Sequence, residues 1–183
     1  DLRTRLSAGE VVPFDIVRNV TDGFAEVFFT LGLALNGEAS DAFTLQYARV
    51  AIYLRPDHAE AILLAGAMLE NLKQYDLATE AYAMVPQSDG GFFAAAIGRA
   101  RTLQGAGKLD AAIEVLNGQI RRNPDQLSVH LALADTLRGA ERWAEATEAY
   151  DKTIALIPQP ATPGFWPVYY SRAIVLERQK LWD

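Results

Sequence analysis

The sequence predicts an all-α solenoid, in which antiparallel pairs of helices stack along one axis. Two observations predict it. Residues of the same type return every 34 positions, and each unit of that length carries two stretches whose apolar residues recur at helical spacing. A single pair cannot cover its own apolar stripe, so neighbouring pairs must stack to bury it.

Four complete units and one partial unit follow from this period. The units span 25–58, 59–92, 93–126 and 127–160, and the partial unit spans 166–183. The predicted helices cover 22–36, 41–54, 58–71, 75–85, 90–105, 109–122, 125–138, 142–156 and 166–179. Residues 1–24 form an N-terminal segment, which we interpret as the end of an upstream helical region.

Three columns of the repeat indicate how the helices pack. Position 8 is small in every unit, which lets two helix axes approach to about 8 Å; its members are Gly32, Gly66, Ala100, Ala134 and Ala173. Position 11 is leucine and fills the space beside them; its members are Leu35, Leu69, Leu103, Leu137 and Leu176. Position 20, in the second helix, holds Thr44, Ala78, Ala112 and Ala146.

Proline residues mark the ends of the units. Pro56, Pro124 and Pro158 each follow a second helix, and we expect Asp57 and Asp125 to start the helices that come next. Pro86 comes four residues early, so we expect the second helix of unit two to end early and 87–91 to form a loop. The proline-rich insertion 158–164 should change the superhelical angle before unit five.

This period and these columns resemble the tetratricopeptide repeat family over residues 25–183. The resemblance implies a right-handed superhelix that acts as a non-catalytic scaffold and binds a partner segment in its concave groove. The stretches 21–29, 81–86 and 169–178 are also similar to long alphaproteobacterial tetratricopeptide proteins, which often carry an export signal upstream. Location therefore stays open, with the periplasm favoured over the cytoplasm.

In this family the first helix of each pair lines the concave groove. The residues that the resemblance assigns to the groove are Phe29, Leu33, Asn36, Leu63, Ala67, Glu70, Ile97, Arg101, Gln104, Leu131, Asp135, Arg138 and Tyr170. Position 5 is apolar throughout, so the Lys, Asn and Arg set with which some members grip a terminal carboxylate is missing. The groove therefore suits an apolar or amphipathic segment, unless neighbouring helices bury these residues.

A second function remains open, that of a structural spacer whose groove is filled by its own chain or by a symmetry mate. Residues 1–20 include the apolar run Val11–Val17. They either end an upstream helix pair, or fold back on the groove or pack on the first pair. The Leu176 face of the last unit lacks intrachain cover, so we also expect a homodimer or a frayed final helix.

Composition argues against several other classes of function. Lys plus Arg number 17 and Asp plus Glu number 23, and this acidic balance disfavours nucleic-acid binding. No apolar run approaches the roughly 18 residues of a membrane span. With no Cys and only two His, we expect neither a metal site nor a cofactor, and no grouping of residues suggests an enzyme. His130 should be a packing residue. Arg99 and Arg172 should each bury the stem and pair with a nearby acid, and a polar binding contact is the alternative.

Overall fold

The computed structural model describes residues 2–11 and 17–180, and in these residues all regular structure is helical. The elements are α1 (Leu2–Ser7), α2 (Val20–Leu35), α3 (Asp41–Leu54), α4 (Ala59–Asn71), α5 (Tyr75–Ala83), α6 (Phe92–Gly105), α7 (Leu109–Arg122), α8 (Leu127–Gly139), α9 (Trp143–Ala155), a 3-10 turn (Pro163–Phe165) and α10 (Trp166–Arg178). The all-α prediction is confirmed, and the predicted helices lie within about two residues of these bounds.

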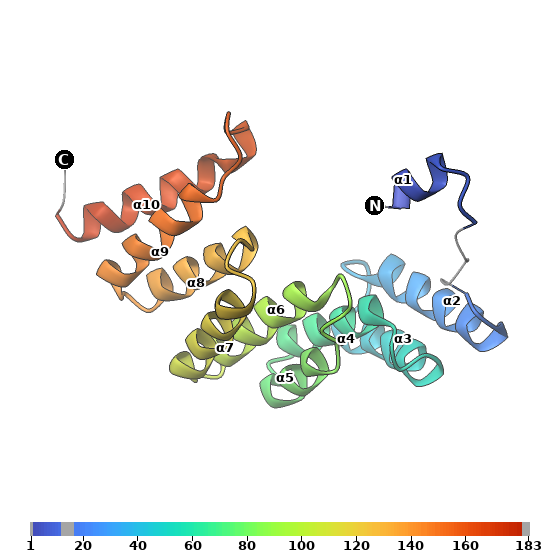
Figure 1. Cartoon of the computed structure of the whole chain (residues 1–183). Coiled ribbons are helices and arrows are strands. Elements are labelled where there is room, and N and C mark those ends of the chain that lie inside the picture. Colours follow the sequence, from blue (N-terminus) through green and yellow to red (C-terminus); the bar gives the residue numbers. More distant parts are fainter. Residues whose placement is uncertain (1, 12–16, 181–183) are drawn as a thin grey trace.

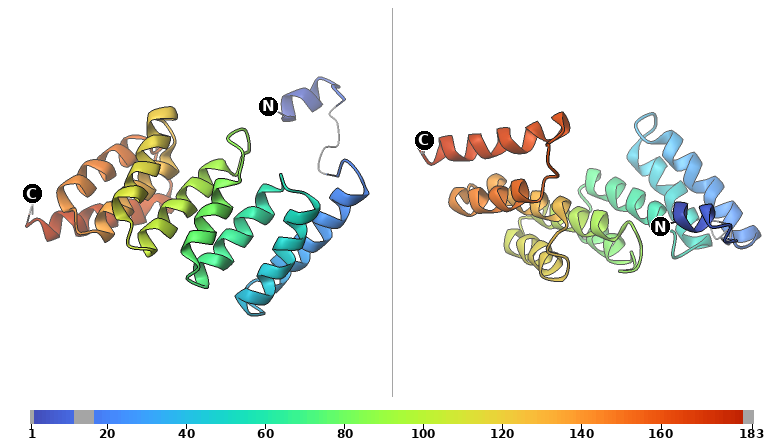
Figure 2. Two further views of the ribbon diagram at one scale, coloured as in Figure 1. Left: turned by 90° about the horizontal axis from the view of Figure 1, so that it is seen from below. Right: turned by 45° about the horizontal axis from the view of Figure 1, so that its top comes forward.

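The helices from α2 to α10 stack in chain order as antiparallel pairs, and each packs on the next (Figure 1). The first helices of the units also lie side by side, α2 with α4, α4 with α6 and α6 with α8. The views of Figure 2 show the same stack as an elongated array. This arrangement leaves two surfaces, one formed by the first helices and the other by α3, α5, α7 and α9.

The three sequence columns form the contacts between the helices. At position 20, Thr44, Ala78, Ala112 and Ala146 are fully buried. The small residues of position 8 are buried in units one to four, whereas Ala173 in the fifth is exposed. Leu69, Leu103 and Leu137 are buried in the interior of the stack. Leu35 and Leu176 are only half-buried, because described helices pack on one side of them alone.

The end of α5 follows the prediction from Pro86. α5 has nine residues, against 14 in α3 and in α7, and a loop runs from its end to Phe92. The prediction for Asp57 and Asp125 is wrong. The N-cap of α4 is His58, whose Nδ1 accepts from the Ala61 amide, and the N-cap of α8 is Gln126. Each helix therefore begins one residue further from its proline, which places the Asp in the turn.

The proline-rich insertion interrupts the row of first helices. In the described residues α10 packs on α9 and follows the 3-10 turn, but it does not lie beside α8 as α6 does. Two residues of α10 are buried, Val168 and Val175, which are seven apart and so share one face of the helix. The row that can form a continuous groove is therefore α2, α4, α6 and α8.

The N-terminal segment divides into two described parts. The residues of α1 from 3 to 7 are exposed, and α1 stands apart from the stacked helices in Figure 1. Within the run Val11–Val17, residues 12–16 lie outside the described residues; Val11 is exposed and Val17 lies against the start of α2. Among the helices of the described residues, none is both long and apolar enough to cross a membrane.

Candidate functional site

With one exception, the predicted groove residues belong to the first helices of the pairs. All of them except Tyr170 lie on α2, α4, α6 and α8, or directly after α2 in the case of Asn36. Tyr170 belongs to α10, where it is 58% exposed and its ring lies 5.7 Å from that of Trp166. Because α10 does not continue the row, Tyr170 is separate from the remaining groove residues.

A cavity of about 310 Å³ lies between α6 and α8 on this surface. Residues from both helices line it: Ile97, Ala100, Arg101, Gln104, Ser128, Leu131, Ala132, Asp135 and Thr136. Five of these residues were assigned to the groove from sequence. Ile97 and Leu131 are among its apolar lining residues, and Arg101 on α6 and Asp135 on α8 are the charged ones.

The apolar residues at position 5 serve the core and the groove surface together. Phe29, Leu63, Ile97 and Leu131 are half-buried and pack against the two hydrophobic clusters of the stack. The ring of Phe29 lies 4.8 Å from that of His58. Leu33, one turn further along α2, is 54% exposed. Both alternatives for this column are therefore partly right: the side chains pack internally and still present apolar surface.

The charges of the groove pair with one another. Arg101 on α6 donates two hydrogen bonds to the Glu70 carboxylate on α4, one from Nε and one from Nη2. The distance from Nη2 to Oε2 is 2.8 Å. The buried hydroxyl of Tyr82 donates to the same carboxylate at 3.4 Å. In the unit that contains α8, the Tyr150 hydroxyl donates to Asp135 and accepts from Arg138 Nε at 3.0 Å.

This acid–arginine–tyrosine arrangement recurs because Tyr82 and Tyr150 occupy the same repeat position, two periods apart. The tyrosines were visible in the repeat, but their role as buried partners of the groove charges was not predicted. Since each arginine already has an acidic partner, an apolar segment can lie over the groove without leaving a charge unpaired.

The two tyrosines make stability sensitive to alkaline pH. Burial and the nearby Glu70 carboxylate raise the pKa of Tyr82 to about 12, and burial and the hydrogen bond to Asp135 raise that of Tyr150 to about 12. The unfolded chain loses these protons near pH 10, whereas the folded chain keeps them. The contribution of the two tyrosines to the free energy of unfolding should therefore not change with pH below about 10. Between about pH 10 and pH 12 that contribution should fall by roughly 2–3 kcal/mol for each tyrosine.

Urea denaturation at a series of pH values between about 9 and 12 measures this fall. A variant with Tyr82→Phe and Tyr150→Phe should lose most of the decline. If its decline equals that of the unmodified chain, other groups cause the pH dependence.

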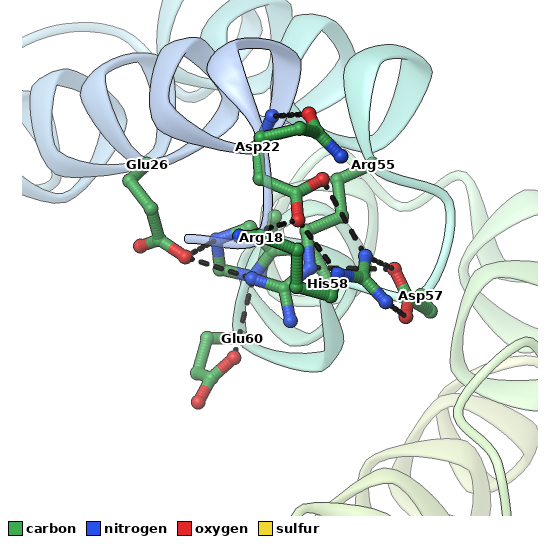
Figure 3. A network of polar contacts seen from close by, with 9 residues as sticks. Arg18, Asp22, Glu26, Arg55, Asp57, His58 and Glu60 are labelled. Atoms are coloured by element: carbon green, nitrogen blue, oxygen red, sulfur yellow. Dashed lines mark hydrogen bonds and ion pairs between the residues drawn. The ribbon is translucent and has the colours of Figure 1, made fainter. Parts of the chain in front are cut away.

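A network of ion pairs fixes residues 17–19 to the first helix pairs (Figure 3). Arg18 Nε lies 2.6 Å from Asp22 Oδ2 on α2, and Arg18 Nη1 lies 3.0 Å from Asp57 Oδ2 in the turn after α3. Arg18 donates to both carboxylates and holds the pKa of each below its usual value. Arg55 adds a bond to Glu26 at 3.0 Å. Arg18 thus ties the residues just before α2 to the first helix pairs, and the two alternatives for residues 1–20 stay predictions.

Both histidines are structural. His58 is buried at the start of α4, with Nε2 3.4 Å from Glu26 and Nδ1 3.2 Å from Glu60. His130 is buried, and its Nε2 lies 2.7 Å from the Pro124 carbonyl, as expected of a packing residue. Over residues 2–11 and 17–180, no three side chains of the metal-binding types come together.

The expected pairing of the two position-7 arginines is half right. Arg172 pairs with Asp151 across α10 and α9. Arg99 was predicted to do the same, and this is wrong: its side chain makes no hydrogen bond or ion pair with any described residue, and its Nε is buried. Glu114 on α7 is bound to Arg121 at 2.6 Å.

Several solved structures share the fold of this chain. No family model matches the chain, and no curated protein matches its sequence. Among solved structures, MamA from Desulfovibrio magneticus RS-1 superposes with a TM-score of 0.64 at 17% identity, over 90% of this chain and 89% of that one. YrrB, described as a TPR protein with an unusual peptide-binding site, superposes at 0.55 and 13%, over 85% and 78%.

The chain has the tetratricopeptide repeat fold. A further MamA structure agrees, with a TM-score of 0.62 at 19% identity over 86% of this chain and 84% of that one. The tetratricopeptide architecture explains why small residues recur at positions 8 and 20. At these identities the likeness is one of fold, so the binding residues of this chain must come from its own surface.

Proposed function

We propose that this chain is a non-catalytic protein–protein interaction scaffold that binds an apolar or amphipathic segment of a partner in the groove of α2, α4, α6 and α8. The observation that carries the proposal is the cavity between α6 and α8, with Ile97 and Leu131 on its wall. A protein of the same fold, YrrB, is described as having a peptide-binding site, which supports this use of the fold.

The chemistry of the groove favours an apolar partner surface. The exposed parts of Leu33, Ile97 and Leu131 gain about 25 cal/mol for each Å² of apolar area that a partner covers. Glu70 and Asp135 already have arginine partners, so the groove gives a strongly charged peptide little to bind. An amphipathic helix or an extended segment with apolar side chains fits these properties.

Leu131→Glu tests the proposal with peptides selected from a random library on the unmodified chain. The substitution puts a carboxylate into the apolar wall beside Asp135, so the Kd of the selected peptides should rise at least about tenfold, or 1.4 kcal/mol. Isothermal titration calorimetry gives the Kd, and circular dichroism checks that the variant is folded.

The matched control is Tyr53→Glu, because Tyr53 lies on α3 and is 85% exposed. It should leave the Kd unchanged. Equal binding by the unmodified chain and by Leu131→Glu would contradict the groove assignment. So would a selection that yields only peptides without apolar residues.

The alternative of a structural spacer or self-associating solenoid stays a prediction. Its surface in the described residues is α10, where the side chains of Trp166, Tyr169 and Tyr170 are exposed. A homodimer through this helix would cover those aromatic rings. The periplasmic location likewise stays a prediction.

A further inference from the structure

A second cavity, of about 550 Å³, lies on the other face of α6. Its α6 residues, Phe92, Ala95, Ala96 and Arg99, lie opposite Ile97 and Arg101 at 100° per residue. We call it the α5–α7 pocket, because the end of α5, the loop after it and the second half of α7 form its other walls. The full lining is Tyr82, Ala83, Met84, Val85, Pro86, Gln87, Phe92, Ala95, Ala96, Arg99, Glu114, Val115, Gly118, Gln119 and Arg122.

The pocket exists because α5 is short. α3 and α7 have 14 residues and α9 has 13, whereas α5 ends after nine, at Ala83. Pro86 lacks the amide hydrogen that another helical turn would need. The helix therefore ends at Ala83, and the chain continues through Val85 and Pro86 into the loop. The missing turn would have filled the space between α6 and the end of α7.

Two buried polar atoms of the pocket's side chains have no partner among the described residues. They are Nε of Arg99 and Oε1 of Gln119, one a donor and the other an acceptor. Leaving a buried polar group without a partner is unfavourable, so a folded protein seldom keeps two in one place without a use for them. Glu114 also lines the pocket, but its one bond among the described residues is from Oε1 to Arg121 at 2.6 Å, and it makes none to Arg99.

These groups define the chemistry of a ligand. The planar guanidinium of Arg99 matches a carboxylate, and Arg122 at the end of α7 adds a second positive charge. Oε1 of Gln119 needs an N–H or O–H donor nearby. The apolar side chains that keep exposed surface among the lining residues are Met84, which is 49% exposed, and the half-buried Phe92 and Val115. A volume of about 550 Å³ is within the range of small-ligand sites.

We propose that the α5–α7 pocket binds the C-terminal residue of a peptide that ends in an apolar amino acid. Its carboxylate would accept from Arg99, its backbone N–H would donate to Gln119, and its side chain would pack on the apolar wall. This site is distinct from the groove between α6 and α8, since it lies on the opposite face of α6 and shares no lining residue with it.

Titration with N-acetyl-alanyl-leucine, followed by NMR of the backbone amides, tests the site. The peptide acid should bind with a Kd on the order of 1 mM or tighter and shift amides of α6 and α7 around Arg99 and Gln119. Its C-terminal amide should bind at least about tenfold more weakly. Arg99→Met should weaken the acid at least about tenfold, whereas Arg49→Met, at an exposed position of α3, should not.

A second readout needs no ligand. Arg99→Met removes an unpartnered buried donor, so the melting temperature of the free chain should stay the same or rise. A fall of several degrees would show that Arg99 is structural and would overturn the proposal. Equal binding of the acid and its amide, or of the acid to the chain and to Arg99→Met, would also overturn it.

Two further titrations distinguish a peptide terminus from a free amino acid, and the pocket from the groove. Free leucine adds a positive charge beside Arg99 and Arg122 and should bind at least about tenfold more weakly than the acetylated peptide. Equal binding would assign the pocket to a small metabolite and overturn the peptide assignment. Leu131→Glu should leave the pocket's affinity unchanged, because it alters only the groove. If it weakens both, the two surfaces are not independent and the pocket assignment fails.

Discussion

Leu137→Ala should lower the free energy of unfolding by roughly 2–5 kcal/mol. Leu137 is 4% exposed and belongs to the hydrophobic cluster that joins α6, α7, α8 and α9. Alanine removes most of this buried side chain and leaves a cavity, because the surrounding helices relax only partially around the missing atoms. The loss combines the transfer free energy of the missing atoms with the cost of that cavity.

Urea denaturation followed by circular dichroism measures the effect as a shift in the transition midpoint. Leu35→Ala is the matched control, since Leu35 holds the same repeat position but is only half-buried. It should cost less than half as much as Leu137→Ala. Equal losses at the two positions would mean that burial between stacked pairs is not what stabilises the leucine column.

Gly98→Ala should destabilise the chain by about 1–3 kcal/mol, although glycine in a helix is normally worse than alanine by roughly 0.5–1 kcal/mol. A Cβ on Gly98 would lie 2.5 Å from Cζ of the Tyr82 ring. A Cβ on Gly66 of α4 would meet the same ring at 2.6 Å, so the backbones of two first helices both limit the movement of the ring. Tyr82 thus packs closely against two glycines on successive first helices.

Gly118→Ala provides the control, because the nearest atom to its Cβ is the flexible Nη2 of Arg121, 3.7 Å away. This substitution in α7 should be neutral or stabilising. In a Tyr82→Leu background Gly98→Ala should lose most of its cost, which a double-mutant cycle measures. If Gly98→Ala and Gly118→Ala have the same effect, the tyrosine does not contact Gly98 as described.

Much of the fold was predictable, because helical periodicity and close packing leave a signature at each position of the repeat. Ala78, Ala112 and Ala146 are fully buried, as a small residue at a helix crossing must be. The early end of α5 followed from the missing amide hydrogen of Pro86. Helix starts were harder: His58 caps α4 in place of Asp57, because the cap depends on backbone geometry in the turn, which residue type alone does not fix.

Part of the cavity lining was predictable from the repeat, whereas its charge pairing was not. Ile97 and Leu131 follow from the repeat register and line one cavity. The pairing of Arg101 with Glu70 joins residues 31 apart and depends on the stacking of α4 on α6. The lack of a partner for the Arg99 side chain could not be inferred either. An arginine looks the same in the sequence whether its side chain is exposed, paired or unpaired. α10 does not continue the row of first helices, and this depends on the path of the insertion 158–164. The 34-residue repeat contains no equivalent of that insertion, so its path could not be predicted.

Mapping a bound peptide by NMR tests most directly whether the first helices form the binding surface. The tightest peptide from the random library is titrated into the full chain, and the shifts of the backbone amides are followed. Shifts confined to α4, α6 and α8, strongest near Ile97, Arg101 and Leu131, are the expected result. Shifts confined to α3, α5, α7 and α9, with affinity unchanged in Leu131→Glu, would contradict it.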